Sequence, residues 1–88
     1  MMMKINIIND NGCLIDNIKW AIDEDFSELA KIRIPFNKTS AADIMRMDNI
    51  SAYSKILLSA AAGAVIQHVI DCHPDMMCNF DDMYMMFE

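Results

Sequence analysis

The sequence contains little glycine, proline or cysteine. Its 88 residues include only two glycines, two prolines and three cysteines. Because the glycines, Gly12 and Gly63, are isolated, no glycine-rich loop is available for a phosphate, and a nucleotide cofactor is not expected. Cys13, Cys72 and Cys78 are an odd number at no framework spacing, which predicts free thiols in a reducing cytoplasm.

Basic residues are absent from the last third of the chain. The formal net charge is −6, and the first 55 residues carry eight acids and seven bases. After Lys55 the charged residues are all acids: Asp71, Asp75, Asp81, Asp82 and Glu88. Such a chain repels the phosphates of nucleic acid, and its C-terminal part favours a basic surface on a partner protein.

No apolar run reaches the length of a membrane span. The longest uncharged stretch, residues 56–70, reads ILLSAAAGAVIQHVI, whereas a span needs roughly 20 apolar residues. The first residues, Met1-Met2-Met3-Lys4, are not followed by the long apolar segment of a signal peptide before Asn9 and Asp10. We therefore expect a cytoplasmic protein that does not enter a membrane.

Residues 50–72 are predicted to form a long central helix. On a 3.6-residue period one broad stripe contains Ile50, Ser54, Leu57, Leu58, Ala61, Val65, His68, Val69 and Cys72. Ile56, Ile66 and Ile70 lie off this stripe, so the helix is apolar on nearly all sides and should be wrapped by other elements. Asp48 or Asn49 is the expected N-cap, and the pair His73-Pro74 should end the helix.

The middle of this helix, residues 59–64, has unusually small side chains. Gly63 costs about 1 kcal/mol relative to alanine in a helix interior, which indicates close packing against something large. The candidates are a sheet, an aromatic such as Trp20 or Phe36, or the same helix of a second copy. In the last case the dimer would be joined through Ala60, Ala61, Gly63 and Ala64.

The N-terminal residues predict a β-hairpin. Residues 3–8 are rich in β-branched side chains, residues 9–12 (Asn-Asp-Asn-Gly) are typical of a tight turn, and residues 13–15 would return antiparallel. Residues 16–31 fit two patterns. Alternation of Ile18, Trp20 and Ile22 would extend the second strand, whereas helical spacing favours a helix over part of residues 17–31, which we prefer.

Three further segments complete a single α+β domain over residues 1–88. Residues 32–36 are expected to be extended, because the residue before Pro35 avoids helical backbone angles. They could form a third strand at a sheet edge, where proline is tolerated. A capping box from Ser40 to Asp43 predicts a short helix through Met47. Asp75 would cap a last helix, with one face formed by Met76, Met77, Phe80, Met83, Tyr84 and Phe87. This face closes over the protein's own core, the favoured interpretation, or forms a methionine-rich docking surface.

Groups that could perform chemistry are few. His68 and Cys72, four residues apart on the helix, are the only pair suited to a zinc site or to a nucleophile and its base. No Cys-x-x-Cys pair supports them, and the adjacent Asp81 and Asp82 read as solvated charges. We expect no metal, no cofactor and no enzymatic activity.

These features predict a small acidic, non-enzymatic protein that binds and blocks a surface of a protein partner. The predicted partner-binding residues are Asp71, Asp75, Phe80, Asp81, Asp82, Met83, Tyr84 and Phe87. In its small size, acidity, Ile/Asn/Met-rich composition and lack of enzyme motifs the chain resembles small phage-encoded inhibitors such as anti-CRISPR proteins. The resemblance implies carboxylates facing a basic channel of a nucleic-acid-binding host or defence complex. The alternative is a structural or regulatory homodimer joined through the central helix.

Overall fold

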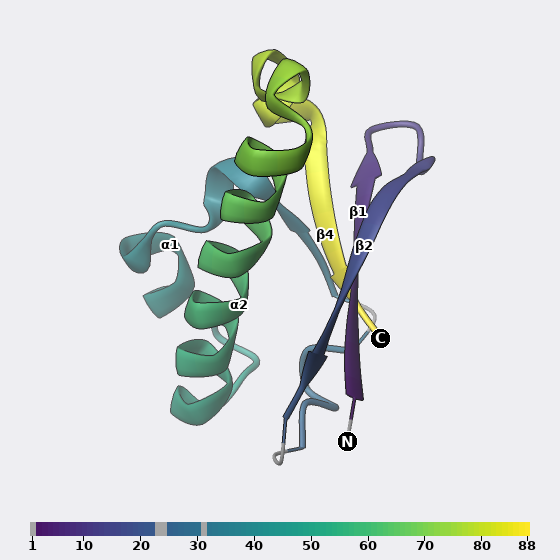
Figure 1. The fold of residues 1–88 in the computed structure, drawn as a ribbon. Helices are drawn as coiled ribbons and strands as arrows, with labels where there is room; N and C mark the ends of the chain where they lie inside the picture. The colour runs from purple at the N-terminus through teal and green to yellow at the C-terminus, as the bar shows by residue number, and fades with distance from the viewer. Residues whose placement is uncertain (1, 23–24, 31) are drawn as a thin grey trace.

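A computed structural model describes residues 2–22, 25–30 and 32–88 as two layers, an antiparallel sheet and the helices on one of its faces (Figure 1). The strands are β1 (Met2–Asn9), β2 (Leu14–Ala21), β3 (Arg33–Pro35) and β4 (Met83–Phe87). The helices are α1 (Ala41–Met45) and α2 (Ala52–Cys72), with 3-10 segments η1 (Phe36–Lys38) and η2 (Pro74–Asp82). The strand order is β2-β1-β4-β3. This confirms the α+β class, the hairpin, the third strand and the central helix with short flanking helices.

The hairpin turn is held by the Asn9 side chain. Its Oδ1 accepts hydrogen bonds from the backbone N–H of Asn11 at 3.0 Å and of Cys13 at 2.9 Å. Gly12 has φ +81°, a left-handed conformation that glycine adopts without steric cost. The turn chemistry read from the sequence therefore produces the predicted hairpin.

The preference for a helix after residue 16 was wrong. β2 continues to Ala21, and Ile18 and Trp20 pair with Ile5 and Met3 of β1. The alternating pattern prevails because pairing with β1 turns the apolar side chains of β2 toward α2. Most of the acidic run at residues 23–25 lies outside the described residues.

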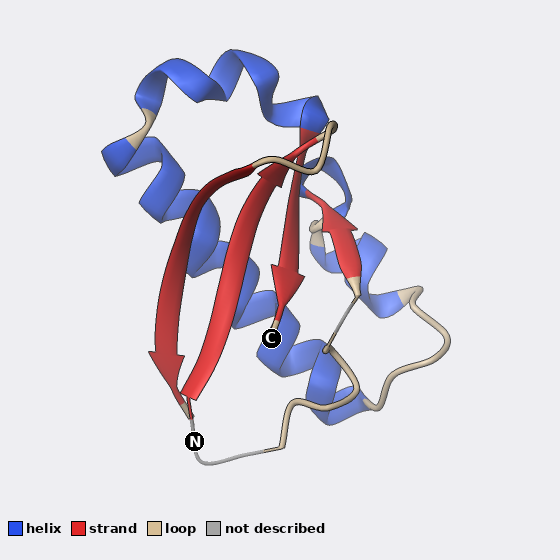
Figure 2. Cartoon of the chain, turned by 90° about the vertical axis from the view of Figure 1, so that its right-hand side faces the viewer, coloured by secondary structure: helices blue, strands red, loops and turns tan. Residues whose placement is uncertain are grey.

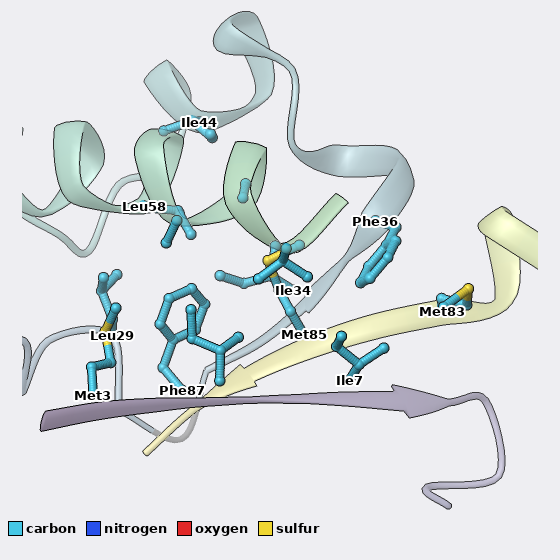
Figure 3. Packing of buried hydrophobic residues seen from close by; sticks show 14 of the residues in the cluster. Met3, Ile7, Leu29, Ile34, Phe36, Ile44, Leu58, Met83, Met85 and Phe87 are labelled. Carbon is cyan, nitrogen blue, oxygen red and sulfur yellow. The ribbon is translucent and has the colours of Figure 1, made fainter. Parts of the chain in front are cut away.

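The core lies between the sheet and α2 (Figure 3). β1 contributes Met3, Ile5 and Ile7, which are 0% exposed, and α2 contributes Leu58, Ala61, Val65 and Val69, also 0% exposed. Burying one such large side chain stabilises the fold by about 1.5–3 kcal/mol. The opposite face of the sheet carries no helix in the described chain (Figure 2).

Both ends of α2 are fixed by specific contacts. The N-cap is Ser51 rather than the predicted Asp48 or Asn49, and its Oγ accepts a hydrogen bond from the N–H of Ser54. The Ser54 hydroxyl, which has the larger effect, and the Ser51 hydroxyl both donate to the Glu28 carboxylate, which lowers the pKa of Glu28. At the other end α2 stops at Cys72, so that His73-Pro74 ends the helix as predicted, and the N–H of His73 donates to Val69 O at 2.8 Å.

The predicted C-terminal helix, with Asp75 as its cap, was wrong. Residues Pro74–Asp82 form the 3-10 segment η2, whose N-cap is His73 and whose backbone is non-helical at Asn79. Residues 83–87 form strand β4, in which Met83, Met85 and Phe87 are buried at 1%, 0% and 0% exposure. The sequence of this segment fits both a helical and an alternating period. The strand forms because β1 and β3 offer it hydrogen-bonding partners on both sides.

By length and composition α2 could span a bilayer, with a mean hydropathy of 1.3. A core helix passes the same test, and one face of α2 is packed on the sheet through Leu58, Val65 and Val69. Composition alone therefore assigns no membrane role.

Candidate functional site

Exposed carboxylates gather at one end of the molecule, which we call the acidic end. Its members are Asp10, Asp71, Asp75, Asp81 and Asp82, all exposed. They come from the hairpin turn, the last turn of α2 and η2, which all lie toward the upper end of the molecule in Figure 1. Asp10 and Asp82 line the same hollow of about 250 Å³ although they are far apart in sequence.

Two carboxylates of the acidic end have side-chain amide partners within the described chain, and the Arg33 guanidinium donates to Asn9 O, beside Asp10, at 3.2 Å. Asp71 accepts a hydrogen bond from Gln67 Nε2 at 3.0 Å, and Asp81 accepts one from Asn37 Nδ2 at 3.4 Å. Within the described ranges, none of the five carboxylates forms an ion pair. They therefore remain hydrated anions with one sign of charge.

The apolar half of the predicted partner surface is corrected by the structure. Met83 and Phe87 point into the core, so their side chains are not available to a partner. Phe80 is half-buried and packs edge to face on Phe36, with ring centroids 5.6 Å apart. Tyr84 lies on the helix-free face of the sheet, where the Arg33 guanidinium covers its ring at 4.3 Å.

The outward face of α2 is a second unusual surface. Tyr53, Ile56 and Ile70 are 49%, 69% and 42% exposed, and they follow a seven-residue repeat with Ala60, Gly63 and Gln67. We call these six residues the outer stripe. A groove of about 450 Å³ between α1 and α2 borders it and is lined by Ile44, Met45 and Ile56 among others.

The predicted dimer residues divide between the two faces of α2. Ala60, Gly63 and Ala64 are exposed, whereas Ala61 is 0% exposed and packs against the sheet, so its assignment to an outer contact was wrong. A Cβ built on Gly63 would meet nothing within 4 Å. Neither the sheet nor Trp20 or Phe36 therefore explains the glycine.

Three titratable side chains from separate segments converge at the C-terminal end of α2. His68 Nε2 and His73 Nε2 each lie 2.8 Å from the same atom, Asp16 Oδ2. Asp16 is on β2, opposite Ile7, and so faces α2. The three ligand atoms lie within 4.8 Å of one another, and the three side chains are about 30% exposed at 32%, 29% and 30%. We call this group the Asp–His–His cluster.

The cluster strongly favours a charged Asp16. Hydrogen bonds from His68, then His73, and from the backbone N–H of Asn17 lower the pKa of Asp16 from 3.8 to about 2. Asp16 Oδ2 accepts hydrogen bonds from both imidazoles, and Asp16 Oδ1 accepts one from the Asn17 N–H at 2.8 Å. The site is therefore a fixed anion facing two nitrogen ligands.

Sequence reasoning had joined His68 to Cys72, noted His73 and Cys78 only as lying just beyond them, and missed Asp16. The Cys72 sulfur does lie 3.8 Å from His68 Nδ1, and Asp16 supplies the third group that a thiol–imidazole pair requires. Cys72 is exposed, however, and it lines neither the groove beside Ile56 nor the hollow at the acidic end. The signal available in the sequence was an aspartate at an inward-facing position of an alternating strand.

The chain matches no protein-family model, no curated protein and no solved structure.

Proposed function

We propose that the chain is a small non-enzymatic protein that uses its acidic end to bind and block a basic surface of a protein partner. The observation that carries the proposal is the convergence of five exposed carboxylates from three segments, none in an ion pair within the described residues. In keeping with the sequence analysis, the partner is a host or defence protein whose basic surface normally receives nucleic acid. The cytoplasmic location, and the absence of a membrane or nucleic-acid partner, stay predictions.

Electrostatics favours this mode of binding. Like charges held together by the fold repel one another, and a cationic partner relieves that repulsion when it docks. The same field steers association and makes the complex sensitive to ionic strength. Half-buried Phe80 adds an apolar contact beside the carboxylates.

Neutralising part of the acidic end should remove the partner. We expect wild-type protein immobilised on resin to retain a basic protein from an extract of its native host, and to release it in a salt gradient. The double variant Asp81→Asn/Asp82→Asn should lose most of the bound partner, because it neutralises two of the five carboxylates of the acidic end. Mass spectrometry of the eluted fractions measures the difference.

The matched control is Asp25→Asn/Asp48→Asn. It changes the formal net charge equally, from −6 to −4, at exposed positions in loops away from the acidic end. The control should retain the partner as the wild type does. Equal loss in both variants would show that total charge, rather than the acidic end, is responsible and would contradict the proposal.

The second candidate is a homodimer joined through the outer stripe. Gly63 lies seven residues from both Ile56 and Ile70. Two antiparallel copies of α2 crossing at Gly63 would place Ile56 of each level with Ile70 of the other, and the missing Cβ would allow close approach. Antiparallel helices also bring opposite ends of their macrodipoles together.

Replacing Gly63 by alanine separates the dimer from the monomer. In a monomer the added Cβ meets open space, so Gly63→Ala should stabilise the fold by about 1 kcal/mol through helix propensity. In a dimer crossing at this residue the same substitution should weaken association. Sedimentation equilibrium at several concentrations, with denaturant unfolding alongside, measures both. A concentration-independent wild-type monomer would eliminate this candidate.

A further inference from the structure

The Asp–His–His cluster has the composition of a metal site. Its three atoms are two imidazole nitrogens and one carboxylate oxygen, which come from β2, α2 and the C-cap of α2 and lie within 4.8 Å of one another. The imidazole rings are inclined at 63° with centroids 6.1 Å apart, so their nitrogens approach Asp16 from different directions. We propose that Asp16, His68 and His73 bind one zinc ion, which revises the expectation that the chain binds no metal.

The distances require a modest rearrangement. Tetrahedral zinc lies about 2.0–2.2 Å from nitrogen and oxygen ligands, which separates neighbouring ligand atoms by roughly 3.3–3.6 Å. The two nitrogen-to-oxygen distances are now 2.8 Å, the length of the hydrogen bonds that zinc would replace. Each nitrogen-to-oxygen distance would have to widen by about half an ångström or more to admit the ion, through rotation of the three side chains. Three protein ligands then leave a fourth position for water.

The surrounding groups hold the ligands in orientation. The Asn17 N–H fixes the far oxygen of Asp16 at 2.8 Å, so the near oxygen faces the histidines. The His73 N–H is bonded to Val69 O at 2.8 Å and its carbonyl accepts the Met76 N–H at 2.9 Å, which fixes the backbone that carries this imidazole. Such outer contacts are what position ligands in metal sites.

Ligand chemistry and local charge favour zinc. Imidazole together with carboxylate suits zinc and related divalent transition metals better than calcium or magnesium, which prefer all-oxygen sites. Asp71 and Asp75 each lie two residues from His73 and are exposed, so they add negative potential near the cluster. Bound zinc would hold β2 against the junction of α2 and η2. Of these elements, η2 carries most of the carboxylates of the acidic end.

The test is a titration of chelator-treated, reduced protein with zinc sulfate by isothermal calorimetry. We expect one ion per chain, and an upward shift of the unfolding temperature on the order of 10 °C at a hundredfold excess over Kd. His73→Gln and Asp16→Asn should each weaken binding at least about 100-fold, since loss of outer-shell partners alone costs up to that much. Cys72→Ser removes no ligand and changes only the group 3.8 Å from His68 Nδ1, so it should weaken binding by no more than about 10-fold.

The wild-type protein gives an independent reading that needs no variant. The chain contains only two histidines, and both are in the cluster. Zinc should therefore shift the imidazole ¹⁵N resonances of both histidines together, with the Nε2 signals moving most. Absence of one-to-one binding, a shift of one histidine alone, or binding that is lost in Cys72→Ser and kept in His73→Gln would overturn the proposal.

Discussion

Deleting residues 83–88 is expected to abolish folding, leaving a chain without a cooperative unfolding transition or near-UV circular dichroism. β4 lies between β1 and β3, and it pairs with both. Its removal takes away three buried side chains, Met83, Met85 and Phe87, and separates β3 from the sheet. A domain of this size is stable by only about 4–13 kcal/mol, less than these losses combined.

The control keeps the β4 backbone and changes only its other face. Tyr84 and Met86 point away from α2 and are half-buried, and threonine is compatible with a strand. Tyr84→Thr/Met86→Thr should therefore fold and unfold cooperatively. A truncated chain that still unfolds cooperatively would contradict the role of β4 and restore the interpretation of the C-terminal segment as a docking surface.

Leu58→Ala is expected to cost about 3 kcal/mol of unfolding free energy, the second-largest effect. Leu58 is 0% exposed on the face of α2 that packs against the sheet. Truncation removes favourable burial and leaves a cavity, and such changes in protein cores cost roughly 2–5 kcal/mol. Urea unfolding followed by circular dichroism measures the change in midpoint.

Leu14→Ala is the matched substitution. Leu14 begins β2 and is 58% exposed, so the same atoms are removed where water already surrounds them. The change should stay within about 1 kcal/mol. Similar losses for the two variants would mean that α2 does not pack on the sheet through this side chain.

Local chemistry made the hairpin and the central helix predictable. Asn9 and Gly12 determine the turn by their own side-chain and backbone properties, and Pro74 ends α2 wherever the helix packs. The Ser40 cap of α1 was also readable, because its Oγ accepts the N–H of Asp43 three residues on. Each of these features depends on residues close together in sequence.

The wrong predictions concern segments whose sequence fits both a helical and a strand period. In these segments, pairing with strands distant in sequence decides which structure forms. Met83, Tyr84 and Phe87 fit one face of a helix, whereas Met83, Met85 and Phe87 fit one face of a strand. Only the position of β4 between β1 and β3 selects the second pattern. The same holds for β2, in which Ile18 and Trp20 face α2 because they pair with buried residues of β1.

The Asp–His–His cluster was beyond sequence reasoning for a related reason. Asp16 is 52 residues from His68 and 57 from His73, and they meet only because β2 runs beside the end of α2. The acidic end, by contrast, was visible in the sequence as a segment without bases. What the sequence could not supply was Asp10, which the hairpin turn brings next to η2.

The salt dependence of the partner complex shows whether the carboxylates of the acidic end make the contact. The proposed binding through hydrated carboxylates predicts that Kd rises about tenfold or more between 50 and 300 mM salt, and that the rise is smaller for Asp81→Asn/Asp82→Asn. A Kd that does not change with salt in either protein would contradict binding through the acidic end and would indicate the apolar outer stripe of α2 instead.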